Sequence, residues 1–276
     1  MKRVKQINNI VIYDLDSYFI AKAPDGSVIY RSKTYAEIES WCKLNKKYRK
    51  NFELKLQKVH EFNVNNKTVL LHGSEHIVRN PVFGGGNSAN DYGLGFYCVE
   101  ERNIELAREW SCSIYNMSGV GYVNKYEIDT TGLKILNLNN FDIIYWVALT
   151  AQFRNISSSL DVVLQLWNNY HIELSKYDII VGWRCDDTYS KIIKDFATGY
   201  ITIEAVADAM KKGYLDNQVV LKSKKAFDRI KFIGAEKVDF SLYNKKFINR
   251  KDRADDAVEK CKRMFRQGHY IDYYLE

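Results

Sequence analysis

Residues 91–97 read Asp-Tyr-Gly-Leu-Gly-Phe-Tyr, and this stretch decides the fold more than any other. Its two glycines allow the backbone to turn sharply, because a residue without a Cβ tolerates positive φ. The aromatic run that follows predicts a strand over 95–99, and apolar residues at helical spacing predict a helix within 101–115. The stretch is not the GxGxxG fingerprint of a dinucleotide-binding βαβ unit. Taken alone, it predicts either an aromatic strand that faces a ligand or a glycine turn before a core strand.

Two other segments place polar residues at the ends of apolar runs. One run ends as His72-Gly73-Ser74, and another opens as Asn217-Gln218. A histidine can hydrogen-bond a ligand hydroxyl, and a neighbouring glycine lets the ligand approach the backbone closely. Each segment also has a plainer interpretation, in which His72 is a satisfied structural histidine and Gln218 is a residue at a strand edge.

Short strands and helices alternate through the rest of the chain. Strand patterns occur in four further places, at 121–129, 177–183, 217–223 and 229–238. Helical patterns also occur in four places, at 142–153, at 159–174, from Thr202 onward, and at 250–268. Short strands with helices inserted between them predict an α+β fold, not a doubly wound parallel sheet.

The same patterns divide the chain into three parts. Residues 1–64 contain a small strand–strand–helix unit and a basic linker, and Thr34 with Glu37 forms a capping-box pattern at the start of its helix. Residues 65–240 hold the main domain, and residues 241–276 form a helical extension. A unit as small as the first buries little core by itself, so we expect it to pack on the rest of the chain.

Composition excludes several classes of protein. The five cysteines have no metal-ligand spacing, so we expect no metal site. The N-terminus lacks the pattern of a secretory signal, and no stretch reaches the roughly 18 apolar residues of a membrane helix, so we expect a cytoplasmic protein without membrane contact. The net charge of +7 fits either a lysine-rich solvated surface or a polyanionic partner such as RNA, DNA or an acidic protein.

Considered together, three segments resemble the His–Tyr–Glu ADP-ribosyltransferases, the superfamily of poly(ADP-ribose) polymerases and diphtheria-type toxins. They are His72-Gly73-Ser74, Asp91 to Tyr97, and Asn217-Gln218 with the apolar run that follows. The likeness is closer to a bacterial family of small ADP-ribosyltransferase-like proteins, whose pattern also includes the helical Ala107 to Trp110 and Tyr177 to Gly182, and it covers about residues 67–234. It implies a split antiparallel β-sheet core with inserted helices. It also implies a reaction in which a nucleophile displaces nicotinamide from NAD⁺, the co-substrate, without a metal.

The resemblance also implies roles for single residues. His72 hydrogen-bonds a ribose hydroxyl of NAD⁺, the Gly73 backbone holds the nicotinamide amide, and Tyr97 packs against the nicotinamide ring. Gln218 stands where polymerases carry glutamate. Its neutral amide still hydrogen-bonds a ribose hydroxyl, but it cannot act as a general base or oppose a developing cation with a full charge. We therefore expect transfer of single ADP-ribose units. Ser74, Gly95, Phe96 and Arg154 complete the expected NAD⁺-binding set.

Three of the charged candidates have two interpretations each. Arg154 is expected to contact the NAD⁺ pyrophosphate as a bidentate donor, or else to form a structural salt bridge. Asp186 and Asp187 are candidates for a supplementary acid or base, or else are favourable charges at a helix N-terminus.

The sequence therefore predicts a mono-ADP-ribosyltransferase with a macromolecular acceptor. Nucleic acid, RNA in particular, is favoured over protein because basic residues gather at 43–59, 222–231 and 245–251. Stand-alone bacterial enzymes of this type are often toxins, so the resemblance implies an antitoxin partner or a part in phage defence. A protein-directed transferase, an NAD⁺ glycohydrolase and an inactive module that binds NAD⁺ or ADP-ribose are the alternatives.

Overall fold

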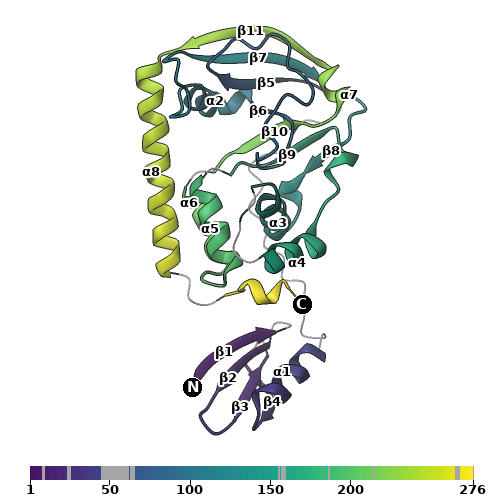
Figure 1. Cartoon of the computed structure of the whole chain (residues 1–276), viewed down its shortest axis with the longest axis vertical. Helices are drawn as coiled ribbons and strands as arrows, with labels where there is room; N and C mark the ends of the chain where they lie inside the picture. Colours follow the sequence, from purple (N-terminus) through teal and green to yellow (C-terminus); the bar gives the residue numbers. More distant parts are fainter. Residues whose placement is uncertain are drawn as a thin grey trace.

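The computed structural model describes residues 1–7, 10–23, 26–44, 62, 66–154, 156, 160–185, 187–213, 215–264 and 268–275. Figure 1 shows a larger body around one long sheet and a smaller body at the end of the molecule where both termini lie. Short, mainly antiparallel strands and separate helices build the larger body, which agrees with the α+β class. No helix in these residues combines the length and apolar character needed to cross a membrane.

The smaller body is an antiparallel sheet of four consecutive strands with one helix. It contains β1 (Lys2–Ile7), β2 (Ile10–Asp14), β3 (Phe19–Lys22), β4 (Val28–Ser32) and α1 (Tyr35–Leu44). The expected strand–strand–helix unit was therefore too small, because the sheet has four strands where two were expected, and β1 was not anticipated. Six buried side chains form its core: Ile7, Ile10, Ile12, Ala21, Ile38 and Cys42.

The predicted capping box at the start of α1 is half formed. The backbone N–H of Glu37 donates to the Thr34 hydroxyl over 3.4 Å, as a cap requires. The Glu37 carboxylate does not return to Thr34, because it accepts from Ser32 Oγ at 2.6 Å and Tyr30 Oη at 2.9 Å. The carboxylate therefore ties α1 to β4 instead of closing the box.

The larger body is built on a seven-stranded sheet with the order β11-β7-β5-β6-β10-β9-β8. Its strands are β5 (Lys67–Ser74), β6 (Phe96–Glu100), β7 (Gly121–Asp129), β8 (Ile135–Asn137), β9 (Ile179–Trp183), β10 (Asn217–Leu221) and β11 (Ile230–Val238). Neighbours are antiparallel except for β8 and β9, which are parallel. This pattern differs from a doubly wound sheet, in which the strands are parallel.

The sheet changes direction along β6. Residues 96–98 of β6 pair with β10, whereas residues 99 and 100 pair with β5. Each half of this short strand therefore holds one neighbour, and β5 and β10 diverge on either side of it. His72 and Gln218 each lie one position beyond the last pair that their strand forms with β6.

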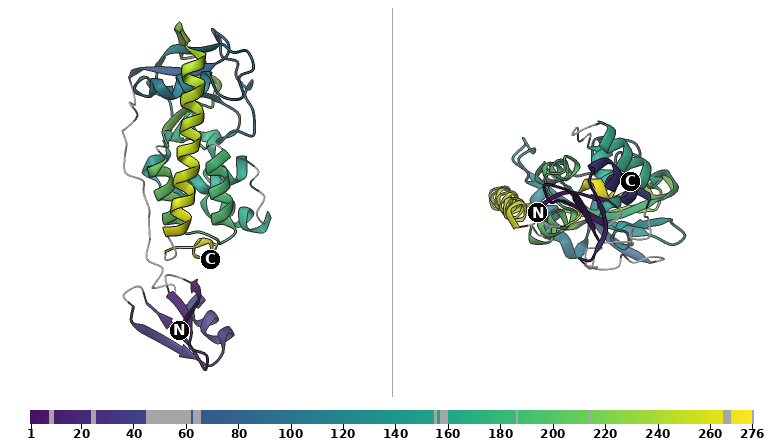
Figure 2. Two further views of the ribbon diagram at one scale, coloured as in Figure 1. Left: turned by 90° about the vertical axis from the view of Figure 1, so that its left-hand side faces the viewer. Right: turned by 90° about the horizontal axis from the view of Figure 1, so that it is seen from below.

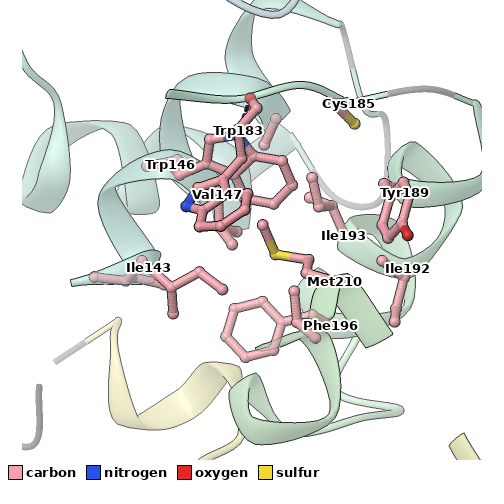
Figure 3. Close-up of a cluster of buried hydrophobic side chains, with 14 of the residues drawn as sticks. Ile143, Trp146, Val147, Trp183, Cys185, Tyr189, Ile192, Ile193, Phe196 and Met210 are labelled. Atoms are coloured by element: carbon pink, nitrogen blue, oxygen red, sulfur yellow. Dashed lines mark hydrogen bonds between the residues drawn. The ribbon is translucent and has the colours of Figure 1, made fainter. Parts of the chain in front are cut away.

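Helices cover the sheet and fill the space beside it. They are α2 (Ile104–Ser111), α3 (Ile143–Phe153), α4 (Leu160–Tyr170), α5 (Asp187–Ala197), α6 (Ile203–Lys212), α7 (Lys224–Phe227) and α8 (Phe240–Met264). The largest apolar cluster joins α3, α5 and α6 to the end of β9, with Trp146, Phe196 and Met210 at its centre (Figure 3). It holds Trp183 in place, because Trp146 Nε1 donates to the Trp183 carbonyl over 2.8 Å.

Helix α8 runs along the side of the larger body, as Figure 2 shows. The expected helix at 250–268 was placed too late, since α8 begins at Phe240. Asp239 explains the early start: its carboxylate accepts the backbone N–H of Leu242 over 3.0 Å, which is an N-cap bond. After α8 the chain reaches the 3₁₀ turn η5 (Ile271–Tyr273), where the smaller body meets the larger one.

Candidate active site

A cavity of about 190 Å³ lies where β5 and β10 diverge from β6. Its wall includes five residues of the predicted set, which come from four strands and helices: His72, Gly73, Tyr97, Arg154 and Gln218. Helix α2 contributes Leu106, Ala107 and Trp110 to the same wall. Residues separated by up to about half of the chain therefore meet in one small, mostly apolar space.

A second cavity of about 450 Å³ adjoins the first. The two share Asn90, Trp110, Arg154 and Arg184, and the second is also lined by Phe247, Arg250 and Lys251 of α8. Together they provide a volume within the range of roughly 300–1,000 Å³ that small-molecule sites occupy. One part is narrow and lies against the sheet, and the other opens between α2, α5 and α8.

His72 has one ring nitrogen fixed by the backbone. Its Nδ1 lies 2.7 Å from the carbonyl oxygen of Tyr97. A carbonyl only accepts, so Nδ1 must carry the hydrogen, and burial lowers the pKa of the imidazole, which favours its neutral form. Nε2 is then an acceptor on a ring that lines the cavity, so it can accept a hydrogen bond from a ligand hydroxyl.

Tyr97 holds the loop before it as well as lining the cavity. Its hydroxyl donates to the Gly93 carbonyl over 2.7 Å and accepts the Tyr92 backbone N–H over 3.0 Å. Burial raises the pKa of Tyr97 far above its usual value, so the phenol stays neutral. The hydroxyl is thus occupied by the loop, and the aromatic ring is the part available to a ligand.

Tyr92 and Lys222 anchor the loop at 91–95 through hydrogen bonds. Tyr92 donates to the Trp183 carbonyl over 2.6 Å, and its ring passes so close to Gly182 that an added Cβ there would lie 2.4 Å from the Tyr92 hydroxyl. Lys222 donates from Nζ to the carbonyl oxygens of Tyr92 and Leu94, and burial lowers its pKa to about 8. These contacts hold the loop against the apolar core.

Asp91 is the centre of the polar part of the site, and only 4% of it is exposed. Oδ1 accepts from Arg154 Nε, and Oδ2 accepts from the Cys185 backbone N–H and from Gln218 Nε2, each over 2.7 Å. Gln218 is 8% exposed and lines the cavity. The carboxylate therefore connects the loop to α3, to the end of β9 and to β10.

Arg154 lies in a salt bridge inside the cavity wall. Besides Asp91, its guanidinium contacts the Cys185 carbonyl, Ser190 Oγ at 3.3 Å and Asp187 Oδ1 at 3.4 Å. These contacts raise the pKa of Arg154 further, although its burial opposes the rise. The structural salt bridge is thus the arrangement that the side chain adopts, and most of its donors already have protein partners.

The other predicted residues are more dispersed. Asp187 begins α5, borders the second cavity and accepts from the Tyr115 hydroxyl over 2.7 Å. Asp186 lies outside the described residues. Three described residues of the predicted NAD⁺-binding set also lie outside the first cavity. Ser74 accepts the His76 backbone N–H, Gly95 borders a separate cavity, and Phe96 packs on the His72 ring.

Two residues that lie in the site were not predicted. The sequence indicated Asp91 only as part of the 91–97 stretch, and it did not indicate Arg184. Arg184 is 4% exposed, lines both cavities and lies 5.8 Å from the Trp110 ring centroid. A charge directly after the apolar run of β9 is the signal that could have identified it, because a charged side chain is seldom fully buried. No cluster of metal-ligating side chains is found among the described residues.

The chain belongs to the family described as "Protein of unknown function (DUF3990)", whose family model matches residues 68–232. The matched region contains the whole lining of the first cavity. It excludes the smaller body and α8, which contributes to the second cavity. No curated protein and no solved structure matches the chain.

Proposed function

We propose that this protein is a mono-ADP-ribosyltransferase that uses NAD⁺. One observation carries the proposal: His72, Tyr97 and Gln218, from three distant segments, line a single cavity at the point where the sheet divides. The division along β6 also supports the finer assignment of the seven-stranded sheet as a split β-sheet transferase core. The resemblance predicted this meeting of residues, and an ordinary set of core strands would not require it.

In this proposal the nicotinamide end of NAD⁺ occupies the first cavity. The Tyr97 ring packs on the nicotinamide and the Gly73 backbone holds its amide. His72 Nε2 and Gln218 Oε1 accept hydrogen bonds from ribose hydroxyls. The pyrophosphate lies toward the second cavity, where Arg184 is its cation. This assignment replaces Arg154, whose donors are engaged with Asp91, Asp187 and the Cys185 carbonyl.

The chemistry is a displacement at C1′ of the nicotinamide ribose. The C1′–N bond breaks and its electron pair leaves with nicotinamide, while a nucleophile of the acceptor forms the new bond to C1′ and releases its proton. The apolar wall excludes water, and the fixed acceptors stabilise the positive charge that develops on the ribose. Gln218 carries no charge of its own, which favours single transfers over chain elongation.

RNA is the acceptor that we favour. A third cavity, about 640 Å³, is lined by aromatic rings including Phe153, Trp167 and Phe227, and the exposed Lys224 lines it as well. Lys222 also lines it, but its Nζ is engaged with the carbonyls of the 91–95 loop. Rings that stack bases beside lysines that hold phosphates are typical of single-strand binding. The basic 43–59 stretch falls almost wholly outside the described residues and adds no structural support.

Labelled NAD⁺ and cell lysate test the proposal. We expect label in macromolecules and release of nicotinamide, and we expect nuclease but not protease to remove the label. Label removed by protease alone would make the enzyme a protein-directed transferase. Nicotinamide release without incorporation would indicate an NAD⁺ glycohydrolase, and intact NAD⁺ would indicate a binding module.

The proposed biological role is that of a cytoplasmic toxin held by an antitoxin or used in phage defence. It rests on the resemblance of the sequence. Induced expression in a bacterial host should arrest growth, whereas His72→Ala should not. Growth arrest by both forms would show that toxicity does not depend on the site.

A further inference from the structure

We infer that Asp91 is a positioning residue that orients the carboxamide of Gln218 and polarises it toward the bound ribose. The inference rests on the proposed function, because it concerns the residue that stands in place of the polymerase glutamate. It gives a role to the buried carboxylate of Asp91, for which the sequence predicted none.

The first step is the polarity of the amide. Asp91 Oδ2 lies 2.7 Å from Gln218 Nε2, and a carboxylate only accepts hydrogen bonds. Nε2 must therefore face Asp91, and Oε1 must face away from it. Gln218 lines the cavity, so the acceptor end of the amide is the end presented to a ligand.

The second step is the rigidity of Asp91. Arg154 binds Oδ1, and the Cys185 backbone N–H shares Oδ2 with Gln218, each over 2.7 Å. The three donors fix the plane of the carboxylate. A charge-assisted hydrogen bond to Nε2 also increases the negative partial charge on Oε1. A neutral glutamine thus gains part of the effect that a glutamate would supply directly.

The smallest substitution that tests this inference is Gln218→Glu, which changes one NH₂ group into an oxygen. It would place two carboxylate oxygens at the 2.7 Å that now separates Nε2 from Oδ2. Two such groups cannot both ionise, so the pair retains one proton and one pKa is raised. While it is protonated, the introduced carboxyl group can donate to Asp91 as the amide does.

The surroundings do not remove this effect. Among the described residues, the charged and titratable groups that line the cavity with Gln218 are Asp91, Arg154, Arg184, His72, Tyr97, Cys98 and Cys185. Arg154 already pairs with Asp91, and the guanidinium of Arg184 lies 5.8 Å from the Trp110 ring centroid. Neutral His72 and the neutral phenol of Tyr97 add no cation.

The test compares thermal unfolding of the wild type and Gln218→Glu across pH. A raised native pKa means that the folded pair binds its proton more tightly than the unfolded chain does. The variant should therefore lose Tm relative to the wild type as pH rises from about 4.3, the usual glutamate value, through the raised pKa. Nicotinamide release by the variant, relative to the wild type, should fall about tenfold per pH unit above that pKa.

Asp91→Asn/Gln218→Glu is the matched control. It exchanges the amide and the carboxylate, so an amide N–H at position 91 can donate to a carboxylate at position 218. The Cys185 N–H then loses its acceptor and Arg154 its counterion, which lowers Tm at every pH, but the pH-dependent part of the gap in Tm should close. The inference is overturned if Gln218→Glu and the wild type change in parallel with pH, or if the double variant keeps the gap. The Tm readout needs no NAD⁺. A wild type that releases no nicotinamide would therefore refute the proposed function separately from the coupling of Asp91 to residue 218.

Discussion

Gly73 shows at the residue scale how closely β5 and α2 approach each other. A Cβ at this position would lie 2.0 Å from the Ala107 carbonyl oxygen and 2.9 Å from the Ser111 backbone nitrogen. Both atoms belong to the backbone of α2, so neither can move without the helix. Packing by itself therefore requires a residue without a Cβ next to His72.

Gly73→Ala should lower the free energy of unfolding by about 1–3 kcal/mol, the usual cost of overpacking. Gly234→Ala in β11 is the matched control, because an added Cβ there would meet nothing within 4 Å. Urea denaturation measures both. Equal stability of the two variants would mean that α2 does not press on Gly73.

The residues of the site were only partly predictable. His72 and Gln218 interrupt apolar runs, and this irregularity identified them. The bond between Asp91 and Gln218 could not be inferred, because 127 positions separate the partners and no local pattern connects them. For Arg154, the choice between a ligand contact and a salt bridge could not be made for the same reason, since it depends on Asp91 from a distant loop.

At the scale of single elements, Arg250 attaches helix α8 to the rest of the larger body. Its guanidinium pairs with Glu109 of α2 and, over 3.0 Å, with Asp216 before β10. Arg250→Met should cost about 3–5 kcal/mol of unfolding free energy, because the buried Glu109 loses its cation. Arg250→Met/Glu109→Gln should recover much of that loss in the same denaturation experiment. A double variant no more stable than the single one would contradict this view of α8.

A second contact between α2 and α8, the ion pair of Glu105 with Lys246, is weakened by acid. The hydrogen bond from Lys246, supported by Arg108 and Tyr243, lowers the pKa of Glu105 from 4.5 to about 2. The charged Glu105 carboxylate therefore stabilises the folded state above pH 4.5, and this stabilisation is lost as pH falls toward 2. Since Glu105 is half exposed, the effect should be below about 1 kcal/mol. The Tm difference between the wild type and Glu105→Gln should shrink from about pH 5.5 to 3. A constant difference would show that Glu105 contributes nothing through its charge.

Helices and strands in which apolar residues recur at a regular spacing were predicted well. Strands without such a pattern, or whose pairing depends on distant segments, were not. The strand at 121–129 and the helices at 142–153 and 159–174 agree with β7, α3 and α4. Strand β1 was missed because Lys2, Arg3 and Lys5 make up half of it, so no apolar alternation marks it as a strand. The pairing of β6 with two neighbours could not be predicted, since it depends on how β5 and β10 approach from distant parts of the chain.

At the scale of the whole molecule, the two bodies meet around Arg3. This side chain lies 5.2 Å from the Tyr270 ring centroid and donates to the Gly268 carbonyl over 3.3 Å. These partners lie at opposite ends of the chain. The sequence therefore predicted that the small unit would pack on the rest of the chain, but it did not predict which residues would form the contact.

The net charge of +7 leads to a prediction for the whole surface. If the acceptor is RNA, lysine and arginine contacts to phosphates release counterions on binding. RNA affinity should then fall about tenfold or more between roughly 50 and 200 mM salt. Fluorescence anisotropy with a single-stranded RNA measures it. Affinity independent of salt would refute a phosphate-bound acceptor and leave the transfer reaction open.

The central claim is that the cavity at the divided sheet cleaves NAD⁺, and nicotinamide release tests it most directly. The wild type and His72→Ala are incubated with saturating NAD⁺ and cell RNA, after circular dichroism has shown that both are folded. We expect nicotinamide and ADP-ribosylated product from the wild type and neither from the variant. Equal release by both proteins, or NAD⁺ left intact by the wild type, would contradict it.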